Sequence, residues 1–357
     1  MNIWSYILKR LLLMIPTLLG VITLTFVVIQ FVPGGPVEQA LMELKAHAGS
    51  GIGAGGEASG GGASQYRGRQ GIDADRVAEI RKLYGFDKPA PQRYWQMLKG
   101  FATFDLGKSF YHHQDVWQLV VSKLPVSITI GMWTFFLTYF ISIPLGIAKA
   151  VREGSRFDTL TSTLVLIGYS IPGFVLGVFL LVMFGGGSFF SWFPLRGLTS
   201  DDWDQLSLVG KVLDYLWHIA LPVTASVAGS FAVMTMLTKN TFLDEIRKQY
   251  VLTARAKGLS ERKVLYKHVF RNALIPLVTG FPAAFIGAFF AGSLLIETLF
   301  SLDGLGLLSY ESVIRRDYPV VMGTLYLFTL IGLVVKLLGD LCYVWADPRL
   351  QFESLNR

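Results

Sequence analysis

Six long apolar stretches decide what this chain can fold into. An α-helix needs about 20 mostly apolar residues to cross the hydrocarbon core of a bilayer. The stretches that reach this length are residues 11–32, 124–148, 160–184, 215–238, 274–296 and 318–346. Backbone groups in lipid must be hydrogen-bonded within their own segment, so each stretch is expected to be helical. The sequence therefore predicts an all-α membrane protein with six transmembrane helices.

The composition and the first stretch support this interpretation. Charged residues make up 16% of the chain, against about a quarter in soluble proteins. The pair Lys9 and Arg10 precedes the first stretch, as in a signal peptide, but that stretch has 22 residues and no small-residue cleavage site closes it. Residues 1–32 are therefore predicted to hold a retained N-terminal span. The single Cys342 excludes an intramolecular disulfide.

The distribution of charge predicts the orientation. The net charge is +7. Basic residues gather in the segments 149–158 and 239–272, whereas acidic residues outnumber basic ones in the alternate segments 201–214 and 297–317. Short basic loops stay in the cytoplasm. Both termini are therefore predicted to be cytoplasmic, and the net charge indicates orientation and not a nucleic-acid partner.

The chain is predicted to have three parts. Residues 1–32 form the first span, residues 33–123 form a periplasmic segment, and residues 124–350 form a core with five spans. Within the periplasmic segment, residues 49–64 are half glycine, a composition that favours a flexible insert. An amphipathic helix is predicted at residues 73–84, ending at Gly85.

A polar, basic island at residues 240–276 separates two apolar stretches. It is predicted to form a helix from Leu243 to Lys257, with Asp244 in its first turn, and Gly258 is expected to end this helix in a left-handed conformation. Ser260 is expected to cap a second helix that has Glu261 in its first turn. Small side chains at Ala254, Ala256 and Gly258 form an edge suited to helix-in-groove docking. The alternative is a basic loop held on anionic lipid.

Other motifs favour structural explanations. Gly107-Lys108-Ser109 ends like a phosphate-binding loop, but Ala102 stands where the motif needs glycine. No catalytic constellation and no metal site is predicted anywhere in the sequence. Lys336 and Asp340 lie four residues apart within the last span, so they are expected to pair on one helix face.

The island also resembles a known family. Residues 250–259, YVLTARAKGL, are similar to the coupling loop of binding-protein-dependent ABC importer permeases in the peptide-importer form. Similar motifs recur along the chain at VPGGP (32–36), DLGKS (105–109), RNALIP (271–276), ETLF (297–300), GLG (304–306) and RDYPV (316–320). The usual Glu-Ala-Ala of the loop is replaced here by Leu252, Thr253 and Ala254. Among peptide importers the oligopeptide, dipeptide and microcin C types are the most similar, with microcin C favoured.

This resemblance implies the type I ABC importer permease fold in a multi-pass protein of the bacterial inner membrane. The expected partners are a second homologous permease subunit, two cytoplasmic ABC ATPase subunits, a periplasmic peptide-binding protein and the lipid bilayer. This chain is expected to be no enzyme and to bind no cofactor, since ATP and Mg²⁺ belong to the ATPase subunits. The residues expected to couple to the ATPases are Thr253, Ala254, Arg255, Ala256, Lys257, Gly258, Leu259 and Glu261.

The resemblance leaves the substrate path to spans two to five without naming residues. Two other classes of protein stay open on the residues alone. A proton-driven secondary transporter would need several carboxylates inside the membrane, and a membrane scaffold without transport would have spans with few prolines.

Overall fold

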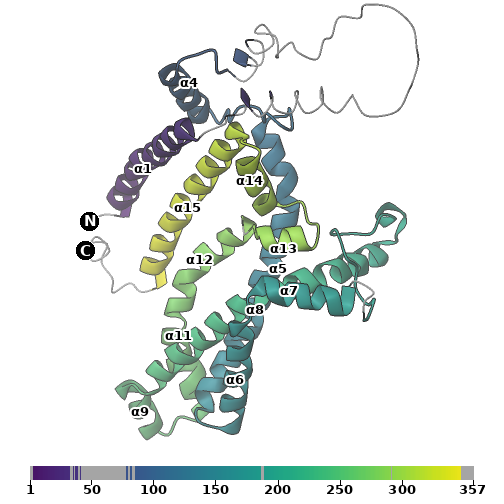
Figure 1. Ribbon diagram of the computed structural model, residues 1–357. Helices are drawn as coiled ribbons and strands as arrows, with labels where there is room; N and C mark the ends of the chain where they lie inside the picture. Colours follow the sequence, from purple (N-terminus) through teal and green to yellow (C-terminus); the bar gives the residue numbers. More distant parts are fainter. Residues whose placement is uncertain are drawn as a thin grey trace, which may run out of the picture. The chain divides into compact units, whose positions relative to one another are not determined.

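A computed structural model describes residues 3–32, 85–185, 189–290 and 292–346, with a few isolated residues between 35 and 82. The predicted Gly-rich insert at 49–64 lies outside these residues, as does most of the helix predicted at 73–84. Gly85, which was expected to end that helix, has a left-handed conformation (φ +69°). The named secondary-structure elements of the described residues are all helices (Figure 1), and an isolated antiparallel β-bridge joins Lys108 and Asp115.

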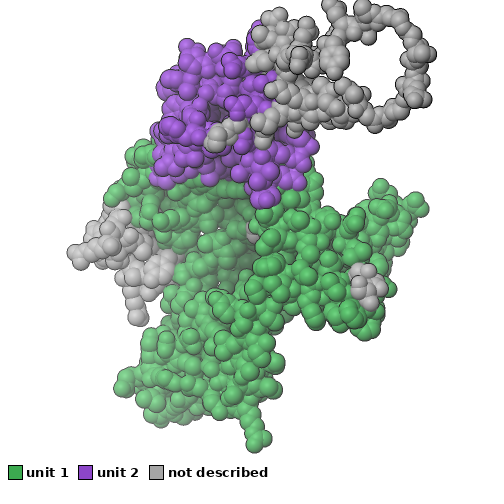
Figure 2. All heavy atoms as spheres, in the orientation of Figure 1, with its two compact units in different colours: residues 1–16, 121–308, 328–357 green, residues 17–120, 309–327 purple. Residues whose placement is uncertain are grey.

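The chain divides into two compact units, which are coloured separately in Figure 2. Unit 1 consists of Met1–Pro16, Val121–Leu308 and Phe328–Arg357, and unit 2 of Thr17–Val120 and Ser309–Leu327. The helices that pass from one unit into the other are α1 (Ile3–Phe31), α5 (Val116–Val151), α14 (Leu305–Ile314) and α15 (Tyr318–Ala346).

The helices confirm an all-α architecture with up to six spans. Five segments are long and apolar enough to cross a membrane: α1, α5, α8 (Leu208–Ile246), α15, and the segment Ile275–Leu299, which contains α12 (Ile275–Phe289) and α13 (Leu294–Leu299). A sixth candidate is a bent pair, α6 (Arg156–Ser170) followed by α7 (Gly173–Leu180) and a π-helical turn at Leu181–Gly185.

The third span differs from the continuous helix expected at residues 160–184. Its two halves meet at 90°. The break lies at Ile171, whose backbone is extended (φ −92°, ψ 117°), directly before Pro172. Proline clashes with a helical residue before it and has no N–H for the helix ladder. Gly173 then approaches α8 so closely that an added Cβ would lie 2.9 Å from the carbonyl oxygen of Ala225.

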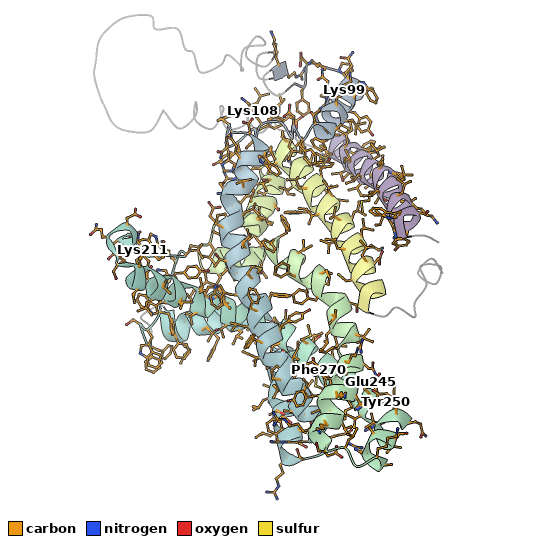
Figure 3. All side chains as sticks on the ribbon, turned by 180° about the vertical axis from the view of Figure 1, so that it is seen from behind. Lys99, Lys108, Lys211, Glu245, Tyr250 and Phe270 are labelled. Carbon is orange, nitrogen blue, oxygen red and sulfur yellow. The ribbon has the colours of Figure 1, made fainter. Side chains whose placement is uncertain are left out.

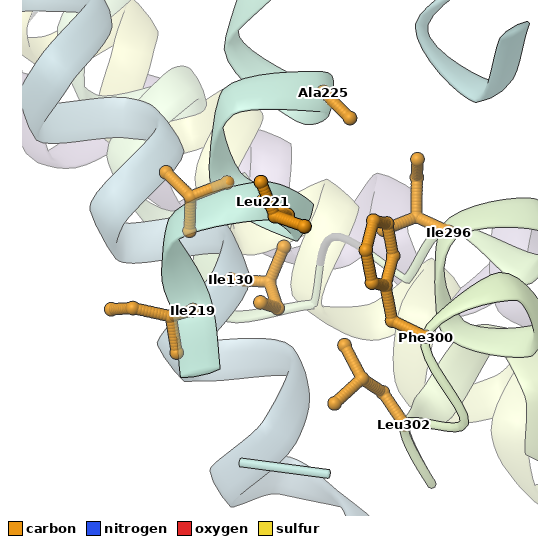
Figure 4. Packing of buried hydrophobic residues seen from close by; sticks show 8 residues of the cluster. Ile130, Ile219, Leu221, Ala225, Ile296, Phe300 and Leu302 are labelled. Atoms are coloured by element: carbon orange, nitrogen blue, oxygen red, sulfur yellow. The ribbon is translucent and has the colours of Figure 1, made fainter. Parts of the chain in front are cut away.

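The core of unit 1 lies where α5, α8 and α13 meet (Figure 4). Ile130 of α5 packs there with Leu221 and Ala225 of α8 and with Ile296 of α13. Glu297 of α13 is 3% exposed and accepts two backbone hydrogen bonds. One comes from the N–H of Ser293 just before α13 (3.1 Å), and the other from the N–H of Leu307 after it (2.7 Å). These bonds satisfy a buried carboxylate that directly follows the apolar stretch 274–296.

In unit 2, α4 (Ala90–Ala102) leads to a loop that contains the Gly107-Lys108-Ser109 motif. The hydroxyl of Ser109 donates to buried Asp317 (2.5 Å), which also accepts from the backbone N–H of Phe110 (2.9 Å). The motif is thus a docking loop for Asp317. It shares only its sequence pattern with a phosphate-binding loop.

The predicted pair of Lys336 with Asp340 is wrong. Asp340 instead accepts a hydrogen bond from the Tyr6 hydroxyl (2.8 Å) and pairs with Arg10 (3.0 Å), while Lys336 is exposed. The two donors on α1 satisfy the carboxylate without a lysine on its own helix. This contact fixes the N-terminal part of α1 against α15 within unit 1.

Candidate coupling site

The first separate helix of the polar island begins later in the chain than the sequence predicts. The helix expected from Leu243 to Lys257 is interrupted, because α8 continues to Ile246 and a new helix, α9, covers Gln249–Ala256. Lys248 between them is extended (φ −74°, ψ 151°). Asp244 and Glu245 therefore lie at the carboxyl end of α8, where the helix dipole disfavours negative charge.

Glu245 is stabilised there by two donors. It accepts hydrogen bonds from Lys248 and from the hydroxyl of Tyr250 (2.6 Å), and Asn272 donates to that same hydroxyl (3.1 Å). Burial and the bond to Glu245 raise the pKa of Tyr250 above its usual value. Figure 3 shows Glu245, Tyr250 and Phe270 together at one end of unit 1.

Gly258 ends α9 as predicted. Its φ of +77° is left-handed. Its N–H donates to the carbonyl oxygen of Arg255 (2.9 Å), and the N–H of Leu259 donates to the carbonyl oxygen of Ala254 (3.3 Å). A Cβ added at Gly258 would meet no atom within 4 Å. The position therefore needs glycine for its backbone conformation, and it also lies in open space that a partner could occupy.

The second predicted helix is confirmed at its start. Ser260 occupies the N-cap position with Glu261 in the first turn of α10 (Glu261–Lys263), but its side chain makes no capping hydrogen bond. The helix continues through a π-helical segment, Val264–Val269, into α11 (Phe270–Ala273). Arg255 and Glu261 form two hydrogen bonds (2.9 and 3.0 Å) that join α9 to α10 across Gly258.

The expected small-residue edge is not one surface. Ala254 is 5% exposed and packs into a core with Val251, Val264, Val269 and Phe242, whereas Ala256 is exposed. Residues two apart point to nearly opposite sides of a helix, so Ala254 supports the surface from beneath. The other predicted residues at positions 253 and 255–258 are exposed, and so is Glu261, while Leu259 is half-buried.

A buried charge cluster that the sequence did not reveal lies beside this core. Lys149 of α5 is fully buried and donates to the Asp158 carbonyl (3.1 Å), Thr161 (2.9 Å) and Ser162 (2.6 Å). Lys239 of α8 donates to both carboxylate oxygens of Asp158 (2.7 and 2.8 Å), and Lys149 lies 3.2 Å from one of them.

The cluster joins α5, α6 and α8. It lies next to the segment from α9 to α11 (residues 249–273), the coupling segment. Ala150 and Phe242 belong to the same core as Ala254. Lys149 directly precedes Ala150 in α5, and Lys239 lies three residues before Phe242 in α8. Arg247 adds an exposed link to Glu153 in the α5–α6 connection (2.7 and 2.9 Å). The coupling segment is therefore connected to α5, α6 and α8 through this core and the Asp158 cluster.

Unit 1 also contains a groove of about 840 Å³. Its described lining comes from α5, α6, α7, α8, α12 and α13. These helices correspond to spans two to five, the spans left as candidates for the substrate path.

Comparisons with known proteins identify the family. Residues 142–352 match the family model described as "Binding-protein-dependent transport system inner membrane component". The chain belongs to this family. A "Peptidoglycan transport system permease protein YejB" from Agrobacterium fabrum (strain C58) is 55% identical over 361 residues, covering 98% of each chain.

Two further relatives have similar coverage. The "Inner membrane ABC transporter permease protein YejB" of Escherichia coli O157:H7 is 53% identical over 98% of this chain and 99% of its own. The "Dipeptide transport system permease protein DppB" of Escherichia coli K12 is 32% identical over 98% of this chain and 99% of its own. The family confirms the predicted importer permease fold and a multi-pass protein of the inner membrane.

Proposed function

We propose that this chain is the permease subunit that carries peptides from the periplasm to the cytoplasm, driven by ATP hydrolysis in separate ATPase subunits. The observation that carries the proposal is the exposed helical turn around Gly258 in a chain that belongs to the importer permease family. Its relatives are named for dipeptide and peptidoglycan transport. The microcin C-type cargo remains a prediction.

The proposed complex has four kinds of component. This chain pairs with a second permease, two ATPase subunits bind the cytoplasmic surface, and a periplasmic binding protein delivers the peptide. ATP and Mg²⁺ are held by the ATPases. The proposed ATPase contacts are Thr253, Arg255, Ala256, Lys257, Gly258, Leu259 and Glu261, with Ala254 beneath them.

The mechanism follows from the connections of this surface. Closure of the ATPases moves α9 and α10. Val251 and Ala254 of α9, and Val264 directly after α10, share a core with the end of α8. The Asp158 cluster carries the movement into α5 and α6, which line the groove. The groove then opens toward one side of the membrane or the other.

A proton-driven mechanism is disfavoured by how the buried carboxylates are held. Asp158 is paired with two lysines, Asp340 with Arg10, and Glu297 is bonded to backbone N–H groups. A relay needs groups that exchange protons along a path, and each of these three carboxylates instead has fixed structural partners.

The test is purification of the tagged chain from native membranes in mild detergent, with all co-purifying proteins identified. Gly258→Trp places a large side chain in the open space, so we expect the ATPases to be lost while the second permease stays. Gly258→Asn is the matched control, because asparagine tolerates the left-handed conformation. Retention of the ATPases by Gly258→Trp would remove this turn from the interface.

A further inference from the structure

The groove in unit 1 has an unusual set of polar groups. Among its described lining residues none is charged, and every polar side chain is a hydroxyl, from two threonines, three serines and two tyrosines. Its volume, about 840 Å³, lies within the range typical of ligand sites. Such a lining offers neutral groups that can both donate and accept hydrogen bonds.

Two of these hydroxyls are buried without a hydrogen-bond partner. Thr134 and Thr138 of α5 both line the groove, and their hydroxyl oxygens are buried without a hydrogen bond. Thr138 is 4% exposed as a residue. By contrast, Thr224 and Thr238 on α8 donate to carbonyl oxygens four residues earlier (2.7 and 2.8 Å). A buried hydroxyl without a partner is costly, so its retention calls for an explanation.

The spacing of the two threonines matches an extended peptide. Residues four apart on a helix lie on one face, separated by about 6 Å. In an extended chain, main-chain groups that point to the same side recur every two residues, about 6.6 Å apart. Each peptide residue has an N–H donor and a carbonyl acceptor, and a hydroxyl can serve either of them. Rotation between threonine rotamers can turn each hydroxyl from the wall into the groove.

We propose that Thr134 and Thr138 bind the main chain of a peptide that lies extended in this groove, and that the groove does not discriminate by the charge of the peptide's side chains. This inference rests on the proposed function, since it assigns peptide-binding residues to a peptide permease. The chemistry fits neutral amide groups, because the described lining offers no charged partner to a carboxylate or an amine.

The decisive variant is the double substitution Thr134→Val with Thr138→Val, which keeps the shape of both side chains. If the hydroxyls serve the peptide, the purified complex should be as heat-stable as the wild type or more so, because the variant removes unsatisfied buried groups. Peptide uptake should nevertheless fall about tenfold or more, because the variant removes both hydrogen bonds to the peptide. A purely structural role would lower both quantities together.

Uptake is measured with the complete importer in proteoliposomes loaded with ATP. The probes are the labelled tripeptides Ala-Ala-Ala, Ala-Asp-Ala and Ala-Lys-Ala, supplied with the binding protein. The matched control is Thr163→Val on α6, whose exposed hydroxyl already donates to the Thr159 carbonyl (3.0 Å). We expect the control to transport like the wild type, and the wild type to take up all three peptides within a few-fold of one another.

A second pair of variants tests contact with the cargo without removing any hydrogen bond of the fold. Ser230 lines the groove and is exposed. Ser230→Asp should favour Ala-Lys-Ala over Ala-Asp-Ala, and Ser230→Lys should have the opposite preference, because a charge in a groove of low polarity attracts its opposite. Equal charge preference in both variants would show that the groove does not contact the peptide.

The outcomes separate this inference from the proposed function. If the wild type takes up none of the peptides in an ATP-dependent manner, the proposed function fails, and the inference fails with it. If the wild type transports them and the double valine variant does so equally well, the function stands and the threonines do not bind the peptide. Loss of the second permease from the double variant on purification would show instead that the groove is a subunit interface.

Discussion

At the scale of single residues, Asp158 neutralises two lysines at once. Its one carboxylate serves two lysines, and Lys149 is fully buried. Asp158→Asn should leave both ammonium groups without a counter-charge and cost about 3–5 kcal/mol of stability, the usual effect of breaking a buried ion pair from one side. The measurement is the apparent Tm of the purified protein in detergent.

The matched control for Asp158 is Glu153→Gln in the neighbouring α5–α6 connection. It removes an ion pair with Arg247, whose side chain is 65% exposed, and such surface pairs contribute at most about 1 kcal/mol. The control should therefore keep a Tm close to the wild type. Equal effects of the two variants would mean that Asp158 does not neutralise buried charge.

Tyr250 links the end of α8 to α9 through Glu245. Tyr250→Phe should cost about 1–2 kcal/mol at neutral pH, because Glu245 and Asn272 each lose a partner. Since the folded pKa of Tyr250 is raised, the folded state holds its proton more tightly than the unfolded state. The wild-type advantage is therefore full below the unfolded pKa of about 10 and declines as the pH rises toward the folded pKa.

The pH dependence is checked by thermal unfolding of wild type and Tyr250→Phe side by side from pH 7 to pH 11. We expect the gap in Tm to be constant up to about pH 9 and to narrow above it. A gap that widened at high pH would show that the hydroxyl is not held in its neutral form by burial and Glu245.

At the scale of helices, α5 and α8 approach through a glycine. A Cβ at Gly146 would lie 2.6 Å from the Cβ of Thr238 and 2.8 Å from the Thr235 carbonyl oxygen, so Gly146→Ala forces the two helices apart. We expect a loss of about 1–3 kcal/mol. Gly168→Ala on α6 is the control, because it meets no atom within 4 Å and should gain up to about 1 kcal/mol from helix propensity. Their Tm shifts should have opposite signs.

The same helices show what sequence could and could not predict. Apolar length is a local property, so the sequence located the five candidate spans and the bent pair. Pro172 in the sequence favours a break in the helix, but the structure adds a 90° bend at which Gly173 lies close to α8. The residue types around Gly258 identified its left-handed turn. The bond between Lys239 and Asp158 joins residues 81 apart in sequence, and spacing along the chain carries no signal for such a pair.

The burial of Ala254 illustrates the same limit within the candidate site. The sequence grouped it with Ala256 and Gly258 as small residues, whereas the structure turns it into the core and leaves the other two exposed. Helical periodicity could have separated Ala254 from Ala256. The break at Arg247 and Lys248 was not expected. It accompanies a long-range contact, since Val251 of α9 packs in one core with Phe242 of α8.

At the scale of the whole molecule, the orientation in the membrane can be tested through one helix. The loop at Asp201 and the turn at Lys257 flank α8, and both residues are exposed. A single span between them must place them on opposite sides. The excess of Lys and Arg near Lys257 predicts that this side is cytoplasmic, as ATPase docking at Gly258 requires.

Cys342 is the only cysteine of the chain, so Cys342→Ala gives a background for single-cysteine labelling. In intact spheroplasts a membrane-impermeant maleimide should label Asp201→Cys, and it should label Lys257→Cys only after the membrane is permeabilised. The reverse pattern would place the coupling turn in the periplasm, where no ATP-driven subunit could act on it. Labelling of both cysteines from outside would mean that α8 does not cross the bilayer, although its 39 residues exceed the length a span needs.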